Sequence, residues 1–297
     1  MLIFEAAALA AALTWAFTGI ISAHPSKTLG ALAFNRARMV MVFAMLALWV
    51  TIAGTWTAIP TSSYWPLIWS GVIGIFLGDT ALFLTMNRLG PRRTAILFSL
   101  NAPISVVLGW LVLGEKLTAS ELLGIIITLS GVILAIVYGK RKEQLHQWEN
   151  INGPLWIGIL FGLAAALAQA IGAAIARPIM ETGVDAVAAS AIRVGASALC
   201  LAAIAALPIN ALRAKTRYTP NLLAMAALSG LLGMGIGMTL LLFALTGGEV
   251  GIVTTLSATT PAMMLPILWW RTKEMPALGA WVGAGLVIVG SALIFNG

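Results

Sequence analysis

The stretch GVIGIFLGDT at residues 71–80 returns 159 positions later as GLLGMGIGMT at residues 230–239. Both copies carry glycine at their first, fourth and eighth positions and threonine at their tenth, within largely apolar sequence. Glycines at such spacing allow two helices to come into close contact, because no side chain separates their backbones. The correspondence indicates that the chain consists of two related halves.

The correspondence extends outward from these two stretches. Residue types that rarely match by chance align at offsets of 158 or 159: Pro103, Glu115, Gly124 and Gly131 with Pro261, Glu274, Gly283 and Gly290. Upstream the offset falls to 157, where Arg36 aligns with Arg193, and to 154, where 9–13 align with 163–167. The offset drifts only where loops change length. We therefore expect a first repeat at 1–138, a polar connecting loop at 139–153 and a second repeat at 154–297.

The composition places both repeats in a membrane. Hydrophobic types make up 60% of the 297 residues and charged types 9%, whereas soluble proteins are about half apolar and about a quarter charged. A helix of about 20 apolar residues crosses about 30 Å of hydrocarbon and satisfies its own backbone hydrogen bonds. Ten such stretches lie near 2–23, 29–51, 66–87, 93–113, 119–138, 154–176, 186–207, 221–245, 250–270 and 277–295. We expect an all-α membrane protein with ten transmembrane helices.

Each repeat would then hold five spans, which is an odd number. The second repeat must therefore enter the membrane from the opposite side, and the two form an inverted repeat. A site between two inverted halves can open alternately to each side of the membrane.

The basic residues predict the orientation. Fourteen of the 17 lysine and arginine residues lie in or beside the loops that follow odd-numbered spans; the exceptions are Lys116, Arg177 and Arg193. Lysine and arginine are retained on the cytoplasmic side, so both termini are expected outside the cytoplasm. We expect a multi-pass protein of the plasma membrane, here a bacterial inner membrane.

Several kinds of chemistry find no support in the sequence. Cys200 has no second cysteine to pair with, and His24 and His146 are too few and too distant to suggest a metal site. No phosphate-binding loop precedes Lys140, because Leu134 stands where its first glycine would be. The net charge of +7 comes from short basic clusters between apolar runs, which argues for orientation in a bilayer and against nucleic-acid binding. We expect no metal or other cofactor, and as partners the lipid bilayer and a small-molecule solute.

Residues 113–117, LGEKL, followed by Gly124 and Gly131 and preceded by Asn101-Ala102-Pro103, carry a family resemblance. They resemble the drug/metabolite transporter superfamily and within it the EamA-like family. The resemblance covers essentially the whole chain, although residues 271–274, RTKE, depart from the first repeat's LGE. It implies a ten-helix secondary transporter with a central cavity lined by the first, third and fourth helices of each half. Family members carry amino acids, sugars, nucleotide-like solutes or toxic compounds, and many ten-span members have cytoplasmic termini, which the charge count here opposes.

Asp79 is the only acidic residue deep within an expected span, 13 positions or about 20 Å into the third. A carboxylate at that depth is costly unless it faces water, a partner or a cavity, so it is a functional candidate by default. Its repeat partner is Met238, so only one half carries the charge. This asymmetry favours binding of a proton or cation that drives transport. The alternative is a fixed ion pair with Arg36 or Arg38.

Other polar residues recur at equivalent places in the two repeats. Trp15 corresponds to Gln169 and Ser99 to Ser257, and together with Asn101 they could bracket a small amphipathic solute. The predicted substrate-binding set is therefore Trp15, Asp79, Ser99, Asn101, Gln169, Met238 and Ser257. Each member taken alone is more readily explained by packing, and Asn101 is equally suited to bonding a backbone group freed by Pro103.

Two further groups of residues have predicted roles in gating or structure. Pro103 and Pro261 lie inside the fourth and ninth spans, where each deprives a carbonyl of its helical partner and can bend the helix at a gate. Glu115 and Glu274 precede the fifth and tenth spans and are expected to stabilise the helix ends. For Arg36 and Arg193 we favour a structural role with the side chain reaching toward the interface, and anion binding is the alternative.

These observations favour a secondary active transporter that exports small metabolites such as amino acids by alternating access. A membrane scaffold or receptor is one alternative, but it has no need of an inverted repeat. A polytopic membrane enzyme is another, but it would need converging nucleophiles, metal ligands or paired carboxylates, and only Asp79 lies well inside.

Overall fold

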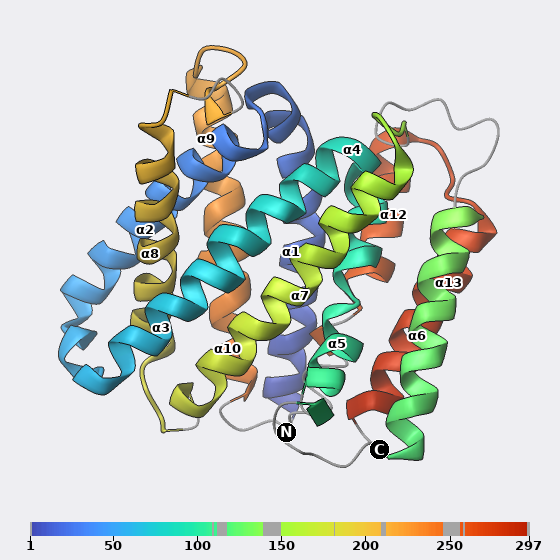
Figure 1. Cartoon of the computed structure of the whole chain (residues 1–297), viewed down its shortest axis with the longest axis horizontal. Coiled ribbons are helices and arrows are strands. Elements are labelled where there is room, and N and C mark those ends of the chain that lie inside the picture. The colour runs from blue at the N-terminus through green and yellow to red at the C-terminus, as the bar shows by residue number, and fades with distance from the viewer. Residues whose placement is uncertain are drawn as a thin grey trace.

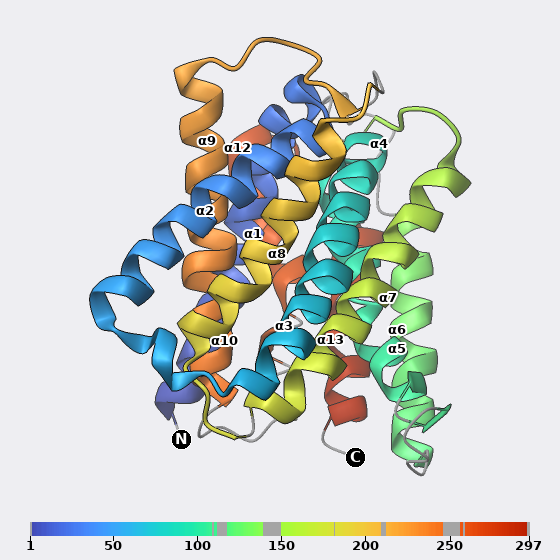
Figure 2. The same ribbon diagram turned by 60° about the vertical axis from the view of Figure 1, so that its left-hand side comes forward.

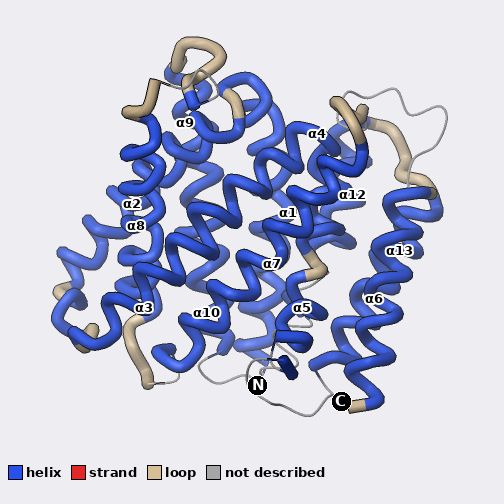
Figure 3. Tube along the Cα trace, viewed as in Figure 1, coloured by secondary structure: helices blue, strands red, loops and turns tan. Residues whose placement is uncertain are grey.

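The computed structural model describes residues 2–108, 110–111, 118–138, 150–180, 182–208, 212–245, 256–257 and 259–295. This described part consists of helices and short connections, without a strand (Figure 3). In a bilayer this is the expected outcome for an apolar chain, because a helix pairs its backbone groups within one segment.

The first half begins with two long helices, α1 (Leu2–Leu29) and α2 (Ala31–Ala53), separated at Gly30. Its third span is composite: α3 (Tyr64–Ser70), the π-helical segment η3 (Gly71–Leu77) and α4 (Gly78–Phe98). Short 3-10 turns η1 (Thr55–Ala58) and η2 (Thr61–Ser63) precede it, and α5 (Asn101–Leu108) and α6 (Ala119–Val137) complete the half.

The second half follows the same order. It begins with α7 (Leu155–Met180) and α8 (Ala186–Ala205). A composite span follows, made of α9 (Pro220–Gly230), the π-helical segment η7 (Leu231–Gly237) and α10 (Met238–Leu245). The last two helices are α12 (Thr260–Thr272) and α13 (Leu278–Phe295).

Seven helices of the described part are long and apolar enough to cross a membrane, and 278–294 form a shorter apolar helix. The expected third and fourth spans are not separate in this count, because 61–98 form one helical run of 38 residues that continues toward α5. Gly90 breaks that run with φ 81° and ψ 169°, a backbone conformation that glycine adopts at little cost. The ninth span is only partly described, since 250–255 and 258 lie outside the described residues.

Both termini lie at the same end of the molecule, at the bottom of Figures 1 and 2. The connection between α8 and α9 lies at the opposite end, near the corner between α1 and α2. There the Lys215 amide donates to the Leu29 carbonyl at 3.0 Å and the Thr216 hydroxyl donates to the Thr28 carbonyl at 3.3 Å. The two halves therefore meet at this basic end.

Helices α6 and α13 pack side by side through glycines (Figure 1). A Cβ atom on Gly124 would lie 2.6 Å from the Gly290 carbonyl oxygen, and one on Gly131 would lie 2.7 Å from the Gly283 oxygen. Larger residues at these positions would force the helices apart, which explains why these glycines recur at equal spacing in both halves.

The distribution of burial is that of a protein whose outer surface meets lipid. Leu48, Trp49 and Ile52 on α2 are more than 60% exposed, whereas Arg38 on the same helix is only 3% exposed. A protein surrounded by water shows the opposite pattern, with apolar side chains buried and charged side chains exposed. One apolar face of α2 thus lies outward, while Arg38 lies inside the helix bundle.

Candidate functional site

The interior of the bundle holds an ion pair between α2 and α4. Arg38 Nη1 donates to Asp79 Oδ2 at 2.5 Å, and both side chains are at most 7% exposed. The Arg38 guanidinium also lies 5.3 Å from the centroid of the Phe83 ring, one turn beyond Asp79 on the same face of α4. The intramembrane carboxylate predicted from the sequence therefore has Arg38 as its partner in this conformation.

Polar groups of α2 and α4 extend this pair. Asn35 Nδ2 donates to Thr80 Oγ1 at 3.3 Å, one residue beyond Asp79. The Asn35 Oδ1 atom and the Arg38 Nε atom are buried without a hydrogen-bond partner. Buried polar atoms are usually paired, so these two mark a place where water or a solute could complete the bonding.

A second arginine approaches the pair from α8. Arg193 is 5% exposed, and its charge interacts electrostatically with Asp79. Its Nη2 atom lies 3.6 Å from the position a Cβ would take on Gly74 of η3, and the same Cβ would lie 3.2 Å from the Gly172 Cα of α7. Arg193 thus lies where η3, α7 and α8 meet.

The two arginines have matching surroundings in the two halves. A Cβ on Gly71 would meet the Arg193 backbone, and a Cβ on Gly230, its repeat partner, would meet the Arg38 backbone oxygen at 3.3 Å. Gly233, the partner of Gly74, lies beside the Arg38 Nη2 atom. These contacts correct the alignment drawn from the sequence: Arg38, and not Arg36, occupies the place equivalent to Arg193, at an offset of 155.

Arg36 lies elsewhere. Its Nη2 donates to the Tyr218 hydroxyl at 3.2 Å and its Nη1 donates to the Leu212 carbonyl at 3.4 Å. Both partners belong to the connection between α8 and α9, so the Arg36 side chain links α2 to that connection. The sequence alignment missed this because arginines two residues apart on a helix point in different directions.

Trp15 on α1 reaches the π-helical segment of the other half. Its Nε1 atom donates to the Gly233 carbonyl at 3.0 Å. A carbonyl in a π-helical segment is a suitable acceptor, because the wider turn disturbs the regular i to i−4 bonding. Gln169, the repeat partner of Trp15, is half-buried on α7. Trp15 therefore lies near Arg38, because Gly233 also lies beside the Arg38 Nη2 atom.

The remaining members of the predicted set bond locally or serve packing. Ser99 Oγ donates to the Ile96 carbonyl at 2.7 Å, and Asn101 Nδ2 donates to the Phe98 carbonyl at 2.8 Å. Met238 is buried at the start of α10 and Ser257 is half-buried. Among the described residues, no hydrogen bond joins Ser99 or Asn101 to the Arg38–Asp79 pair.

Both predicted hinge prolines lie in the first turn of a helix. Pro103 is the third residue of α5, after a break at Ser99–Leu100, and Pro261 is the second residue of α12. Each proline frees the carbonyl four residues earlier. The Ser99 carbonyl accepts from the Ala102 amide at 3.3 Å, and the Ser257 carbonyl accepts from the Thr260 hydroxyl at 2.9 Å.

Of the two predicted helix-end glutamates, Glu115 lies outside the described residues. Glu274 lies four residues before α13, and its backbone amide donates to Thr272 Oγ1 at 3.2 Å. The described N-terminus of the fifth span is capped by Thr118 and Glu121, whose side chains and amides bond reciprocally at 3.1 and 2.7 Å. The Thr-x-x-Glu spacing is a sequence signal for this capping box, and the prediction of Glu115 missed it.

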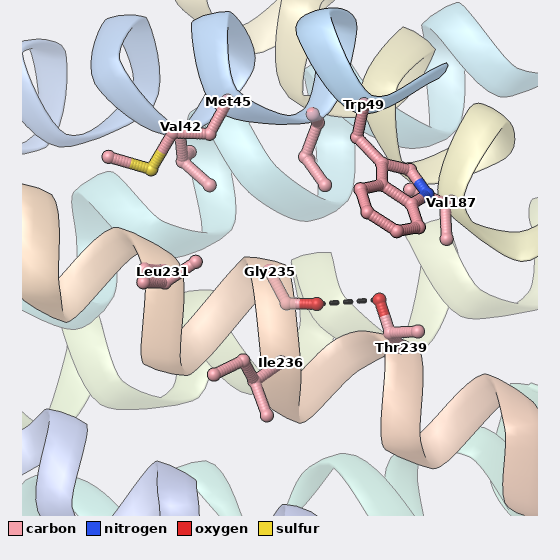
Figure 4. Close-up of a pocket in the computed structure, with 9 residues that line it drawn as sticks. Val42, Met45, Trp49, Val187, Leu231, Gly235, Ile236 and Thr239 are labelled. Carbon is pink, nitrogen blue, oxygen red and sulfur yellow. Dashed lines mark hydrogen bonds between the residues drawn. The ribbon is translucent and has the colours of Figure 1, made fainter. Parts of the chain in front are cut away.

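An apolar cavity of about 280 Å³ lies between α2 and the composite span of the second half (Figure 4). It is lined by Val42, Met45 and Trp49 of α2, Val187 of α8, and residues of η7 and α10. Val42 lies one helical turn from Arg38 on the same face of α2, so the charged and apolar regions are neighbours. The sequence did not predict this cavity, because its lining residues are of the same apolar types as those on the other helix surfaces.

Known proteins resemble this chain in fold and in family. No curated protein sequence matches it. A solved structure titled "Crystal structure of protein" superposes with a TM-score of 0.71 over 98% of this chain and 95% of its own, at 16% sequence identity, which is evidence for the fold alone. The EamA-like transporter family matches residues 2–137 and 156–296, one segment in each half. The chain therefore belongs to the EamA-like transporter family, a family of multi-pass membrane proteins within the drug/metabolite transporter superfamily.

Proposed function

We propose that this protein is a secondary active transporter that exports small metabolites such as amino acids by alternating access. The observation that carries the proposal is the buried group Arg38, Asp79 and Arg193, to which both halves contribute. Buried charges are costly in a membrane and are retained where a solute or ion passes. A scaffold or receptor has no use for such a group between two halves.

The proposed architecture is ten transmembrane helices in two inverted five-helix repeats, at 1–138 and 154–297, joined by a polar loop at 139–153. The paired contacts support it: Gly71 with Arg193 and Gly230 with Arg38 are the same contact in opposite halves. The glycines of α6 and α13 support it too, because Gly124 packs on Gly290 while their repeat partners Gly283 and Gly131 pack on each other. This exchange is what an approximate two-fold axis between α6 and α13 produces.

Transport is tested with purified protein in proteoliposomes. Vesicles preloaded with one unlabelled amino acid should take up the same labelled amino acid faster than protein-free vesicles. A scaffold or receptor would give no uptake. A membrane enzyme would return the solute chemically altered, so the recovered label is also identified by chromatography.

Asp79 is the proposed coupling residue, and its coupling ion is a proton. Two arginines near one carboxylate leave a net positive environment, which disfavours a metal cation there. Coupling requires that the Arg38–Asp79 pair open in the other conformation, so that the carboxylate differs in proton affinity between the two states. The alternative is a pair that stays closed and only stabilises the fold.

The variant Asp79→Asn separates these roles, because it keeps the shape and removes the titrating group. If Asp79 couples, accumulation against a gradient should fall at least about tenfold while solute exchange persists, as expected when one essential protonation is lost. If the pair is static, the variant should lose stability and keep the wild-type dependence of flux on pH. Identical pH profiles for the two proteins would rule out coupling.

The proposed orientation places both termini outside the cytoplasm, in a bacterial inner membrane. The support is that 14 of 17 basic residues lie at loops after odd-numbered spans or on the adjoining helices, where Arg38, Arg92 and Arg93 are buried, and that both termini lie at the same end of the structure. A reporter that is active only in the cytoplasm should be inactive when fused after Gly297 and active when inserted at 140–149. The reverse result would invert the orientation without affecting the fold.

A further inference from the structure

The Arg193 guanidinium has no bonding partner in the described part of the chain. The residue is 5% exposed, its Nε atom is buried without a hydrogen-bond partner, and no hydrogen bond or ion pair joins either Nη atom to a described residue. A guanidinium carries five N–H donors in a planar fork. The Arg193 donors are therefore available to an acceptor from outside the described part of the chain.

The Nη2 atom of Arg193 lies at the boundary between the two halves. A Cβ on Gly74 would lie in contact with Nη2, at 3.6 Å, and Gly74 itself packs closely against Gly172 of α7. Gly74 belongs to the first half and Gly172 to the second. An acceptor placed there would touch both halves, which is where a transported solute must bind.

The equivalent arginine shows which acceptor fits. Arg38 has the matching surroundings in the first half and bonds a carboxylate, that of Asp79. The residue that repeats Asp79 in the second half is Met238, which offers no acceptor oxygen to Arg193. The second half therefore keeps the arginine and lacks its carboxylate.

The charges of the group lead to the same conclusion. Arg38 and Arg193 are positive, and Asp79 is the only acidic residue that is buried in the described part. Asp79 already bonds Arg38, so one positive charge remains uncompensated. One external carboxylate would bring the group to neutrality and supply the geometry that suits a guanidinium fork.

We propose that Arg193 binds the carboxylate of the transported solute, in the place that Asp79 takes beside Arg38. The inference rests on the proposed transport function and narrows its substrates to compounds that carry a carboxylate.

Binding is tested on the purified full chain in detergent by thermal unfolding with matched probes. The probes are L-alanine, L-leucine, L-phenylalanine, L-threonine, L-glutamate and L-lysine, each beside its carboxamide, together with hexanoate beside hexanamide and inorganic phosphate. A ligand of the native state raises the unfolding temperature. At least one carboxylate should do so, and its amide should need about a tenfold higher concentration, the loss expected when a charged hydrogen-bond partner is removed.

Three variants assign that effect to Arg193. Arg193→Met should abolish the carboxylate-dependent shift, and Arg193→Lys should keep part of it, because lysine retains the charge and loses the fork. Arg36→Gln is the matched control, since Arg36 bonds Tyr218 and Leu212 outside the group, and it should leave the shift unchanged. If Arg193→Met does not yield folded protein, two measurements still test the proposal. They are the thermal shifts of the wild-type protein with each acid and its amide, and the shift that remains in Arg193→Lys.

Several outcomes would overturn the proposal. They are equal shifts from acids and amides, an unchanged shift in Arg193→Met, no shift from any carboxylate, and a phosphate shift larger than that of every carboxylate. Flux in proteoliposomes distinguishes this inference from the proposed function. Flux that is insensitive to Arg193→Met would support the transport function and exclude the site at Arg193. Arg193-dependent binding without any flux would support the site and exclude the transport function.

Discussion

Arg38 and Arg193 occupy equivalent places in the two halves but have different partners. Arg38 bonds the Asp79 carboxylate at 2.5 Å, while Arg193 has Met238 at the equivalent sequence position and no hydrogen bond to a described residue. Gly71 and Gly74 near Arg193 correspond to Gly230 and Gly233 near Arg38, whereas Gly172 near Arg193 corresponds to Thr18. Duplication therefore explains the shared framework, and the difference at positions 79 and 238 explains why Arg38 has a carboxylate partner and Arg193 has none among the described residues.

The largest expected effect comes from breaking the internal pair. Arg38→Met should lower the free energy of unfolding by about 3 kcal/mol, because it leaves the buried Asp79 without its hydrogen-bonded partner. Adding Asp79→Leu to this variant should recover at least half of the loss, since an apolar pair needs no compensation. Denaturant unfolding of both variants in detergent measures the difference.

Additive losses in the double variant would contradict this account. They would mean that Arg38 and Asp79 stabilise the fold independently, through contacts such as the one between Arg38 and Phe83.

A second prediction makes the two halves alike. Met238→Asp should be more stable than Met238→Asn by about 1.5 to 3 kcal/mol, because only the aspartate can form a charged hydrogen bond with Arg193. The comparison with asparagine cancels the cost of burying a polar group of that size. Unfolding midpoints of the two variants provide the measurement.

The same Met238→Asp variant should also lose the carboxylate-dependent thermal shift, because its own side chain would occupy Arg193. Equal stabilities for aspartate and asparagine would place position 238 out of reach of Arg193. In that event the two arginine sites would be equivalent in their backbone contacts but not in the side chains that reach the guanidinium.

The smallest expected effect distinguishes the framework contacts of the two halves. A Cβ on Gly71 would lie 2.7 Å from the Arg193 Cα, whereas one on Gly230 would first meet the Val42 Cβ at 3.1 Å. Backbone cannot move aside as a side chain can. Gly71→Ala should therefore cost about 2 kcal/mol and Gly230→Ala about 1 kcal/mol, within the range for overpacking.

The two alanine variants differ by one methyl group from the same parent, so the measured difference needs no further correction. A larger loss for Gly230→Ala would indicate that α2 is held more rigidly than α8.

The glycine pattern and the apolar runs alone predicted a great deal. They placed helices at nearly all of the described spans, because a helix is the only local structure that an apolar segment of this length can form in lipid. They also identified Asp79, since a carboxylate in such a segment is conspicuous whatever its partner. The helix-end role was assigned to Glu115, although the Thr-x-x-Glu spacing of Thr118 and Glu121 marks the capping box that the structure contains.

Only the tertiary structure showed which arginine forms the ion pair with Asp79 and which has no carboxylate partner among the described residues. Arg36, Arg38 and Arg193 are chemically identical, and a drift of two residues in the repeat offset was enough to pair the wrong ones. On a helix two positions differ by about 200° in direction, so that small error exchanges an interior side chain for one that bonds a surface connection. The partner of a buried charge is set by the packing of helices far apart in sequence, and no local pattern records it.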